Sequence, residues 1–344
     1  MTAINPQPNI ARSPARPAII VTNLVKRYSK AKTNAVDDVS FAVRPGEIFG
    51  LLGPNGAGKT TTIGVLTTAI VPTSGAANIA GVDVARDPIG VKQRIAVVPQ
   101  QSNLDRSLKV REILTFHAAY HGVGRREREQ LADSLLDQLG LGERKNEKVS
   151  QYSGGMVQRL MIARALMHEP EVLFLDEPTN NLDPQSRLFL WEKMRGLHAR
   201  GLTILLTTHD MEEADQLCDR VAIMDHGKIL VNDSPEELKR TLPGSSALEL
   251  QTFTNSGDYT RVNQRISTLL GSLPGTLKVD TLPDETNPEE PGLCTHRLFG
   301  DNVHALIGSA AQAIAEAGAE VRNVSVKKPS LEEVFLSLTG RHLR

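Results

Sequence analysis

Short apolar runs alternate with amphipathic segments up to about residue 242, which is the pattern of an α/β protein. Continuous apolar runs predict buried parallel strands at residues 48–52, 95–98, 172–175 and 202–206. Alternating or short segments predict further strands at residues 18–28, 35–43, 76–84, 220–225 and 228–232, the last two joined by a hairpin at His226-Gly227. Apolar periodicity predicts helices at about residues 60–69, 107–149, 153–168 and 183–201, and Asp87-Pro88 and Asp183-Pro184 each predict a helix start with the Asp as cap. The sequence therefore predicts a parallel sheet with helices between its strands.

The pattern changes at residues 243–246, where a Pro-Gly-Ser-Ser stretch separates two regions. Beyond it, the predicted order is β-α-β-β-α-β, a ferredoxin-like α+β pattern, with elements at residues 247–254, 258–270, 276–282, 293–299, 302–317 and 320–327. A final helix begins at Ser330, with Glu333 completing a capping box. We expect a disordered tail at residues 1–17, a main domain at 18–243 and a smaller domain at 244–344.

A glycine-rich loop joins the strand at residues 48–52 to the helix that follows. Its residues are Gly53, Pro54, Asn55, Gly56, Ala57, Gly58, Lys59 and Thr60, spaced as G-x-x-x-x-G-K-T. Glycines let the backbone wrap an anion, and the amides at the helix N-terminus attract phosphate. Lys59 would reach the outer phosphates and the Thr60 hydroxyl would complete a Mg²⁺ shell. This loop predicts binding of a nucleoside triphosphate.

Polar residues follow the buried strands at one edge of the predicted sheet. Asp176 ends its strand and can hold Mg²⁺, while Glu177 can orient or deprotonate a water for attack on the γ-phosphate. His209 ends another strand beside the same edge, where contact with the γ-phosphate is favoured over a purely structural role. Gln100 ends a third strand, and its amide can ligate the metal or bridge to the attacking water.

A second glycine-rich helix start, Ser153-Gly154-Gly155, lies about a hundred residues after the first. It offers a second anion-binding site. One triphosphate does not need two such sites in one subunit. The simplest interpretation is that the second site binds a nucleotide held by a partner copy, which predicts a dimer.

Composition narrows the class of protein further. The net charge of −1 gives no reason to expect a nucleic-acid partner. The two cysteines are far apart, which favours a reducing compartment and packing roles. No run approaches the roughly 18 apolar residues of a membrane span, and the polar, proline-containing N-terminus is not typical of a signal peptide. If the protein acts at a membrane, other subunits must therefore span the bilayer.

These motifs occur in the order found in ATP-binding subunits of ABC transporters, and the chain resembles that family over about residues 18–242. The resemblance implies a P-loop NTPase fold with a RecA-like core, an antiparallel β subdomain and a helical subdomain at about 103–168. It also implies ATP and Mg²⁺ as ligands. The matched positions are Tyr28 for adenine stacking, Gly53 to Thr61 for Walker A, Gln100 for the Q-loop, Tyr152 to Met156 for the signature, Asp176 for Walker B, Glu177 for the catalytic carboxylate, Asp183 for the D-loop and His209 for the switch histidine. Tyr28 lies on the first predicted strand, and Thr61 closes the Walker A match. The signature departs from the commoner Leu-Ser-Gly-Gly-Gln at Tyr152 and Met156, but its Ser-Gly-Gly backbone is intact.

Softer matches resemble the branch that exports drugs or lipo-oligosaccharides. They lie at residues 101–105 and 110–112, at Trp191-Glu192, at 209–214 and at 329–335. In that branch the permease is a separate integral-membrane chain. The resemblance therefore implies a peripheral protein at the cytoplasmic face of a cell membrane, of bacterial origin.

Two alternatives remain open at this point. One is an importer ATPase whose C-terminal domain is regulatory. The other is a soluble ABC protein that acts on ribosomes or DNA, although such proteins carry two cassettes or a long coiled coil and each motif occurs once here. In the favoured interpretation, two ATP molecules join two cassettes and hydrolysis through Glu177 and His209 releases them.

Overall fold

The computed structural model describes residues 16–241, 246–255, 257–283, 292–300, 302–327 and 329–340. These residues form two compact units that divide between Pro235 and Glu236, and each unit is described by itself. The predicted tail at residues 1–17 and the predicted boundary at residue 243 lie almost entirely outside the described residues.

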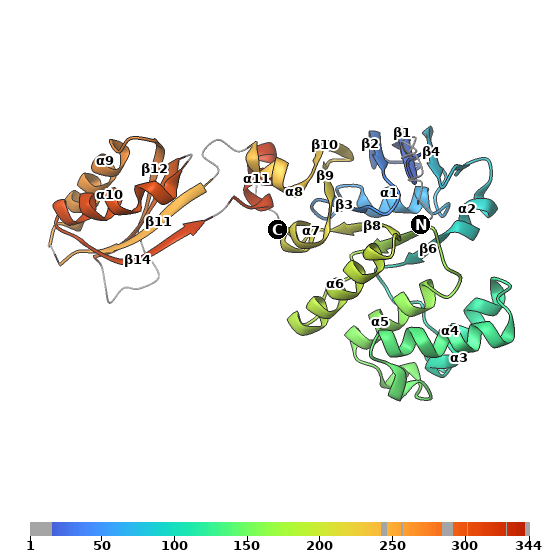
Figure 1. Ribbon diagram of the computed structural model, residues 1–344. Helices are drawn as coiled ribbons and strands as arrows, with labels where there is room; N and C mark the ends of the chain where they lie inside the picture. The colour runs from blue at the N-terminus through green and yellow to red at the C-terminus, as the bar shows by residue number, and fades with distance from the viewer. Residues whose placement is uncertain are drawn as a thin grey trace, which may run out of the picture. The chain divides into compact units, whose positions relative to one another are not determined.

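A six-stranded sheet forms the centre of the first unit (Figure 1), with the strand order β10-β9-β3-β8-β7-β6. Its strands are β3 (Ile48–Leu52), β6 (Ile95–Val98), β7 (Val172–Asp176), β8 (Thr203–Thr208), β9 (Arg220–Asp225) and β10 (Lys228–Asp233). The first five run parallel, and β10 returns antiparallel through the predicted turn at His226-Gly227, where both φ angles are positive. Every residue of β3, β7 and β8 is buried, because helices and a second sheet cover the faces of this sheet. The predicted buried strands are confirmed.

A second, antiparallel sheet packs against the core sheet in the same unit. Its order is β2-β1-β4-β5, with bounds β1 (Ile19–Lys26), β2 (Val36–Val43), β4 (Ser74–Ile79) and β5 (Val82–Asp83). One face of each long strand is buried, which explains the alternating sequence pattern. Phe41 on β2 stacks on Phe49 of β3 with ring centroids 5.1 Å apart, so the two sheets share one core.

Seven α-helices and two 3₁₀ turns complete the described part of the first unit before its boundary. Their bounds are α1 (Lys59–Leu66), α2 (Pro88–Arg94), α3 (Val110–Tyr120), α4 (Arg125–Gln138), η1 (Gly142–Arg144), η2 (Val149–Gln151), α5 (Gly154–Ala165), α6 (Pro184–Ala199) and α7 (Met211–Leu217). The expectation of one helical stretch at 107–149 is wrong in detail. Gly122 and Gly140 adopt positive φ after α3 and α4, which ends each helix. Figure 1 shows α3, α4 and α5 grouped together, away from the antiparallel sheet.

Helix α7 was not predicted from the apolar pattern. Asp210 caps it by accepting hydrogen bonds from the backbone of Glu212 and Glu213, at 2.9 and 3.2 Å. An Asp with acids in the following turn is a helix start signal that the sequence contained. The predicted caps Asp87 and Asp183 are confirmed at α2 and α6.

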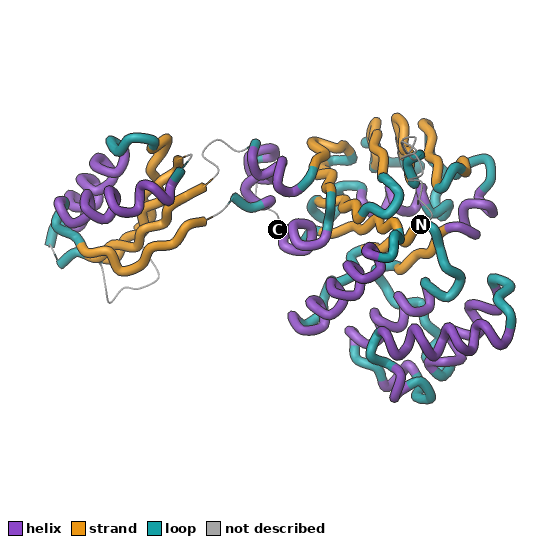
Figure 2. The backbone as a smooth tube through the Cα atoms, in the orientation of Figure 1, coloured by secondary structure: helices purple, strands orange, loops and turns teal. Residues whose placement is uncertain are grey.

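The second unit contains a four-stranded antiparallel sheet with two helices packed on it (Figure 2). The elements are α8 (Pro235–Arg240), which starts at the unit boundary, β11 (Ser246–Phe253), α9 (Tyr259–Gly271), β12 (Thr276–Pro283), β13 (Leu293–Gly300), α10 (Val303–Glu316), β14 (Glu320–Lys327) and α11 (Leu331–Thr339). The strand order is β12-β13-β11-β14. The core consists of apolar side chains from the strands, α9 and α10. The capping box of Ser330 and Glu333 is confirmed at α11.

None of the described helices is both long enough and apolar enough to cross a bilayer. Cys218 and Cys294 are buried and unbridged, in agreement with the packing role expected for them.

Candidate functional site

The glycine-rich loop runs from the end of β3 to the start of α1, as expected. Gly58 has a φ of 106°, and a Cβ there would lie 2.4 Å from the Ala35 carbonyl oxygen. A Cβ on Gly53 would lie 2.2 Å from the Met224 carbonyl oxygen. Only glycine fits at these two positions. The first backbone amides of α1 have no acceptor within the helix, so they are available to an anion.

The Lys59 side chain folds back into this loop. Its Nζ donates hydrogen bonds to the carbonyl oxygens of Gly53 and Pro54, at 2.7 and 3.1 Å, and lies 3.6 Å from Glu177 Oε1. Burial lowers the pKa of Lys59, and the Glu177 carboxylate opposes that shift. A cavity of about 320 Å³ opens here, lined by Ala35, Asn55, Gly56, Ala57, Gly58, Lys59, Thr60, Thr61, Gln100 and Glu177. The loop therefore presents a buried cation and helix amides to one hollow.

Asp176 and Thr60 converge at the tip of β7, as the sequence predicted. The Thr60 hydroxyl donates to Asp176 Oδ1 at 3.3 Å. Thr207, on the neighbouring strand β8, donates a second hydrogen bond to the same carboxylate oxygen. Hydroxyl and carboxylate oxygens are the donors that Mg²⁺ prefers, and adjacent ligands of an octahedral Mg²⁺ lie about 3 Å apart. The residues present fit that ion.

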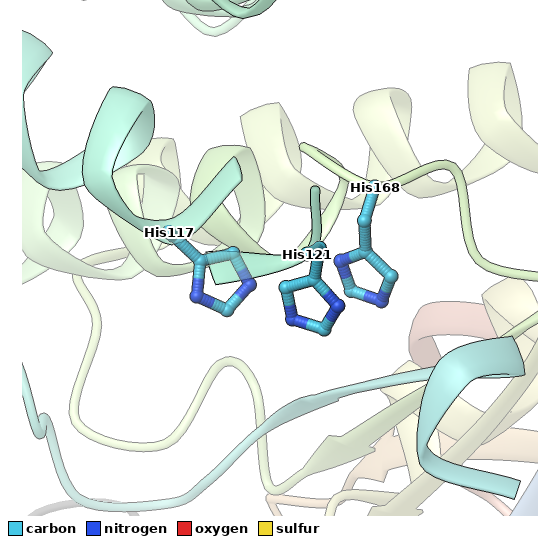
Figure 3. Close-up of side chains that lie close together, drawn as sticks. All are labelled: His117, His121 and His168. Atoms are coloured by element: carbon cyan, nitrogen blue, oxygen red, sulfur yellow. The ribbon is translucent and has the colours of Figure 1, made fainter. Parts of the chain in front are cut away.

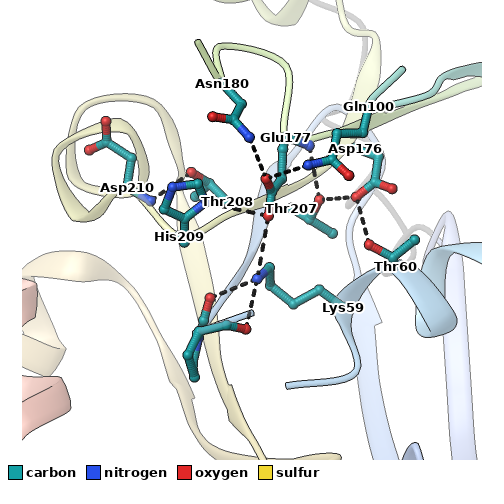
Figure 4. Close-up of polar contacts among 12 residues, drawn as sticks. Lys59, Thr60, Gln100, Asp176, Glu177, Asn180, Thr207, Thr208, His209 and Asp210 are labelled. Carbon is teal, nitrogen blue, oxygen red and sulfur yellow. Dashed lines mark hydrogen bonds and ion pairs between the residues drawn. The ribbon is translucent and has the colours of Figure 1, made fainter. Parts of the chain in front are cut away.

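Glu177 lies at the centre of the polar contacts in Figure 4. Its φ of 49° is unusual for a residue other than glycine. Its backbone N–H donates to Thr207 Oγ1 at 3.0 Å, which anchors this turn to β8. Its Oε2 accepts hydrogen bonds from the side-chain amides of Gln100 and Asn180, at 2.9 and 3.0 Å. The carboxylate is buried and oriented by amide donors.

His209 follows β8 and points toward the same carboxylate. Its Nδ1 lies 3.4 Å from Glu177 Oε1 without forming a hydrogen bond. Four residues from separate segments therefore meet at one point: Lys59, Gln100, Glu177 and His209. The parallel register of β6, β7, β8 and β3 brings these segments to the same sheet edge.

Sequence reasoning missed Thr207 and Asn180, which hold Asp176 and Glu177 in place. Both follow or end buried strands, but their partners are only visible in three dimensions. It also missed a buried brace in which Glu213 accepts hydrogen bonds from Thr179 Oγ1 at 2.7 Å and from Trp191 Nε1 at 3.2 Å. Burial raises the pKa of Glu213. The brace connects the chain after Glu177 with α6 and with α7, which follows His209.

Tyr28 differs from its expected position. Strand β1 ends at Lys26, because the chain turns at Tyr28, whose carbonyl accepts a hydrogen bond from Ala31. Tyr28 is 44% exposed, and its hydroxyl lies 3.4 Å from Thr61 Oγ1 in the first turn of α1, directly after the glycine-rich loop. The expectation of a strand residue is therefore wrong, but the exposed ring lies beside the loop where an adenine base could stack on it.

Ser153 and Gly154 are exposed at the start of α5. The Ser153 hydroxyl caps the helix by accepting from Met156 N at 3.4 Å. A Cβ on Gly155 would lie 2.6 Å from Ser186 Oγ, so this glycine permits α5 to approach α6 closely. Asp183 is exposed as the cap of α6, where a hydrogen bond from Ser186 lowers its pKa. None of these residues lines the cavity at Lys59.

A larger hollow of about 840 Å³ lies elsewhere, among Arg16, Ile20, Pro45, Asn78 and Glu171. It contains none of the residues discussed above. Size alone therefore does not mark the site in this molecule, whereas converging charged groups do.

The described geometry agrees with what comparison with known proteins shows. The family model of the ABC transporter matches residues 36–180. The chain is 38% identical to the daunorubicin resistance ATP-binding protein DrrA3 of Streptomyces coeruleorubidus, over 94% of this chain and 96% of that protein. It is 37% identical to the Nod factor export ATP-binding protein I of Paraburkholderia xenovorans, over 95% of this chain and 99% of that protein.

Solved structures give the same picture for the cassette. An ATP-binding subunit of an ABC transporter superposes with a TM-score of 0.60 at 32% identity, over 65% of this chain and 92% of that one. A dimeric ATP-binding cassette in a post-hydrolysis state, bound to ADP and Pi, superposes with a TM-score of 0.58 at 25% identity, over 63% of this chain and 98% of that one. The fold and site define a nucleotide-binding P-loop ATPase. Within that class, the chain belongs to the ABC transporter family.

Proposed function

We propose that the chain is the ATPase subunit of an ABC exporter, and that two copies close on two ATP molecules. Each ATP is held between the Lys59 loop of one copy and the Ser153 turn of the other. The observation that carries the proposal is the exposure of Ser153 and Gly154 at a helix N-terminus that lies outside the cavity at Lys59. An exposed helix N-terminus attracts phosphate oxygens, and a second copy can bring one to that cavity.

The residues around the cavity have separate roles in this proposal. The amides of Gly56 to Thr61 and the Lys59 ammonium bind the phosphates, and Tyr28 stacks on the adenine. Glu177 accepts a proton from the attacking water, while His209 contacts the γ-phosphate and Gln100 positions the carboxylate. What supports these roles is the convergence of Lys59, Gln100 and His209 on Glu177. Asp183 of the partner borders the closed site.

Mg²⁺ is held in this proposal by Thr60 and Asp176, with the amide oxygen of Gln100 nearby. The support is the oxygen donor set and the 3.3 Å contact between Thr60 and Asp176. When bound, the ion neutralises charge on the phosphate oxygens. Thr207 holds the carboxylate in the orientation that this role requires.

The partners proposed for the cassette dimer are integral-membrane permease subunits on separate chains, which place it at the cytoplasmic face of a bacterial cell membrane. Support comes from relatives named for daunorubicin resistance, doxorubicin resistance and Nod factor export. These names favour export over import. Closure on ATP and release after hydrolysis switch the permease between two arrangements. We propose no role for residues 1–17.

The second unit is proposed to be a ferredoxin-like accessory domain of residues 244–344, following a cassette of 18–243 with a helical subdomain at about 103–168. The support is the element order β11-α9-β12-β13-α10-β14 and the antiparallel strand order β12-β13-β11-β14.

Mixing two inactive variants tests the shared site. In a closed dimer, Lys59→Ala and Ser153→Glu each disable both sites when alone. A mixed dimer of the two variants has one site with both changes and one site with neither. We therefore expect the mixture to occlude ATP and to hydrolyse it in a single turnover. The amount hydrolysed should exceed the sum of the amounts measured for the two separate variants.

Ser134→Glu, at an exposed position of α4, is the matched control and should behave like the unchanged protein. No gain on mixing would contradict a site shared between copies.

The membrane partner is tested by capture. The tagged protein should recover an integral-membrane protein from detergent extracts of its own cells and should not recover ribosomes. Recovery of ribosomes with no membrane protein would favour the soluble class of ABC proteins instead.

A further inference from the structure

Three histidines from segments far apart in the sequence meet in the first unit, outside the nucleotide cavity (Figure 3). His117 and His121 lie one turn apart at the end of α3, so they share a face of the helix. His168 lies in the chain after α5. One ring nitrogen of each histidine lies within 4.8 Å of the other two.

The ring nitrogens of this cluster are not all satisfied. His117 Nε2 and His168 Nδ1 are buried and have no hydrogen-bond partner. Leaving a buried polar atom without a hydrogen-bond partner destabilises the fold, so two such atoms in one cluster call for a cause. An ion held between the rings would satisfy both.

The other nitrogen of His168 is held as metal-binding histidines usually are. His168 Nε2 lies 2.9 Å from the Ile95 carbonyl oxygen, which can only accept a hydrogen bond. Nε2 is therefore the donor in this contact, and Nδ1 is the nitrogen left for the cluster. A second hydrogen bond to a backbone carbonyl is the usual support of a histidine ligand, since it fixes the tautomer and the ring orientation.

Burial also favours the neutral form of two of the three rings, those of His117 and His121. Burial lowers the pKa of His117 to about 4, and burial likewise lowers the pKa of His121. His121 stacks on His168 with ring centroids 3.9 Å apart and planes 7° from parallel. Neutral imidazole binds a metal without first losing a proton.

We propose that His117, His121 and His168 form a binding site for a divalent transition-metal ion such as Zn²⁺. Three imidazoles suit zinc, copper or nickel and do not suit Mg²⁺ or Ca²⁺, which prefer oxygen. Zinc–nitrogen bonds of about 2.0 Å in a tetrahedral set place the three nitrogens about 3.4 Å apart. The rings reach that spacing by turning out of the stacked arrangement. Water takes the fourth position.

One neighbouring charge opposes the ion. The Arg164 guanidinium lies close enough to lower the pKa of His117, and it is held by a hydrogen bond to Asn103 Oδ1 at 2.6 Å. Its charge weakens the binding of a cation. The site is therefore weaker than a closed structural zinc site with thiolate ligands.

The position of the cluster gives the ion a structural effect that is independent of ATP hydrolysis. His117 lies in α3 and His121 is the C-cap of that helix, whereas His168 is hydrogen-bonded to Ile95 at the start of β6. Strand β6 leads to Gln100. An ion bound by all three residues connects α3 to the base of this strand and stabilises the first unit. Saturation with the ion therefore raises the free energy of unfolding of the first unit.

Cobalt and zinc titrations test the site on the full chain, prepared without a polyhistidine tag and stripped with a chelator. Co²⁺ should give a visible absorption band of imidazole-bound, four-coordinate cobalt that saturates at one ion per chain, and Zn²⁺ should displace it. His117→Ala and His121→Ala should each weaken Zn²⁺ binding at least about tenfold, because losing a ligand costs no less affinity than losing a hydrogen-bond partner of a ligand. His304→Ala, which removes an exposed histidine on α10, is the matched control and should bind as the unchanged protein does.

Each variant is checked by circular dichroism and by ATP binding, so that loss of the fold is not mistaken for loss of a ligand. His168→Ala also removes the hydrogen bond to Ile95, and for this reason the two α3 variants carry the test. Zinc binding of equal strength in the unchanged protein and in the double variant of His117 and His121 would overturn the proposal. The absence of a saturable one-to-one cobalt spectrum would overturn it as well.

Discussion

The Lys59 ammonium lies 3.6 Å from the Glu177 carboxylate, and both side chains are almost fully buried. The cation of the glycine-rich loop is thus paired with the proposed catalytic base. A γ-phosphate that enters the loop competes with Glu177 for the same cation. In the proposed mechanism, ATP therefore frees Glu177 from Lys59, while Gln100 and Asn180 keep holding the carboxylate for the attacking water.

Replacing Glu177 with Gln should separate binding from hydrolysis. The amide keeps the shape of the side chain but cannot take up a proton, so we expect turnover to fall at least about 100-fold. Loss of the negative charge removes the competitor for Lys59, so ATP affinity should stay the same or increase. Single-turnover hydrolysis, calorimetry and gel filtration with ATP measure the rate, the affinity and the closed dimer.

Glu192→Gln is the matched control for this experiment, because Glu192 is an exposed residue of α6 away from the cavity. Its rate should not change. A near-native rate in Glu177→Gln would show that another group acts as the base.

Gly58→Ala should abolish nucleotide binding. The new Cβ would lie 2.4 Å from the Ala35 carbonyl oxygen, at a φ of 106° that alanine rarely adopts. We expect a loss of about 1–3 kcal/mol in the free energy of unfolding, together with a distorted loop. Urea unfolding and calorimetry measure the two effects.

Gly196→Ala provides the comparison, because Gly196 lies in the exposed interior of α6 and its Cβ would meet no atom within 4 Å. That change should raise stability by about 0.5–1 kcal/mol and leave ATP binding unchanged. Equal behaviour of the two variants would contradict the steric argument for Gly58.

Thr207→Val should impair hydrolysis more than it impairs folding. The Thr207 hydroxyl donates to Asp176 and accepts from Glu177 N, so valine removes the support of both carboxylates. We expect a loss of about 1–2 kcal/mol in stability and at least about a tenfold loss in rate.

Thr203→Val on the same strand separates the two effects. Thr203 is also buried, and its hydroxyl accepts a hydrogen bond from Gly46 N at 2.9 Å, away from the cavity. We expect a similar stability loss and a normal rate. If both variants lose the same activity, Thr207 acts only through the fold.

His296 should make the second unit sensitive to acid. The side chain is fully buried on β13, and burial lowers its pKa from 6.5 to about 4. The unfolded chain therefore binds a proton at a higher pH than the folded chain does. The stability that depends on the neutral ring is complete above pH 6.5 and is lost as the pH falls toward 4, up to a total of about 3 kcal/mol.

Hydrogen exchange of the β11 and β13 amides between pH 7 and 4.5 measures this loss, corrected for intrinsic exchange rates. The single tryptophan, Trp191, reports on the first unit by fluorescence and serves as an internal reference. His296→Gln should flatten the difference, and His304→Gln should not. An unchanged pH slope in His296→Gln would contradict the assignment.

Much of the fold could be predicted because its signals are local. A few consecutive residues specify each of these features: the buried runs at β3, β7 and β8, the hairpin at His226-Gly227, and the caps Asp87, Asp183 and Ser330. The long helical stretch failed because apolar periodicity continues through Gly122 and Gly140, where a positive φ ends the helices. Tyr28 was misplaced for a similar reason, since a turn beside a strand leaves the alternation intact.

By itself, the sequence determined the chemistry of the loop at Lys59, the acids Asp176 and Glu177 and the second glycine-rich helix start at Ser153, because each is a contiguous motif with its own local geometry. Only the tertiary structure decided what these residues meet. The register of the parallel strands brings Thr207 under both acids and aims Lys59, Gln100 and His209 at Glu177. It also brings His168 to His117 and His121. Contacts between distant segments depend on strand order and packing, which no short stretch of residues specifies.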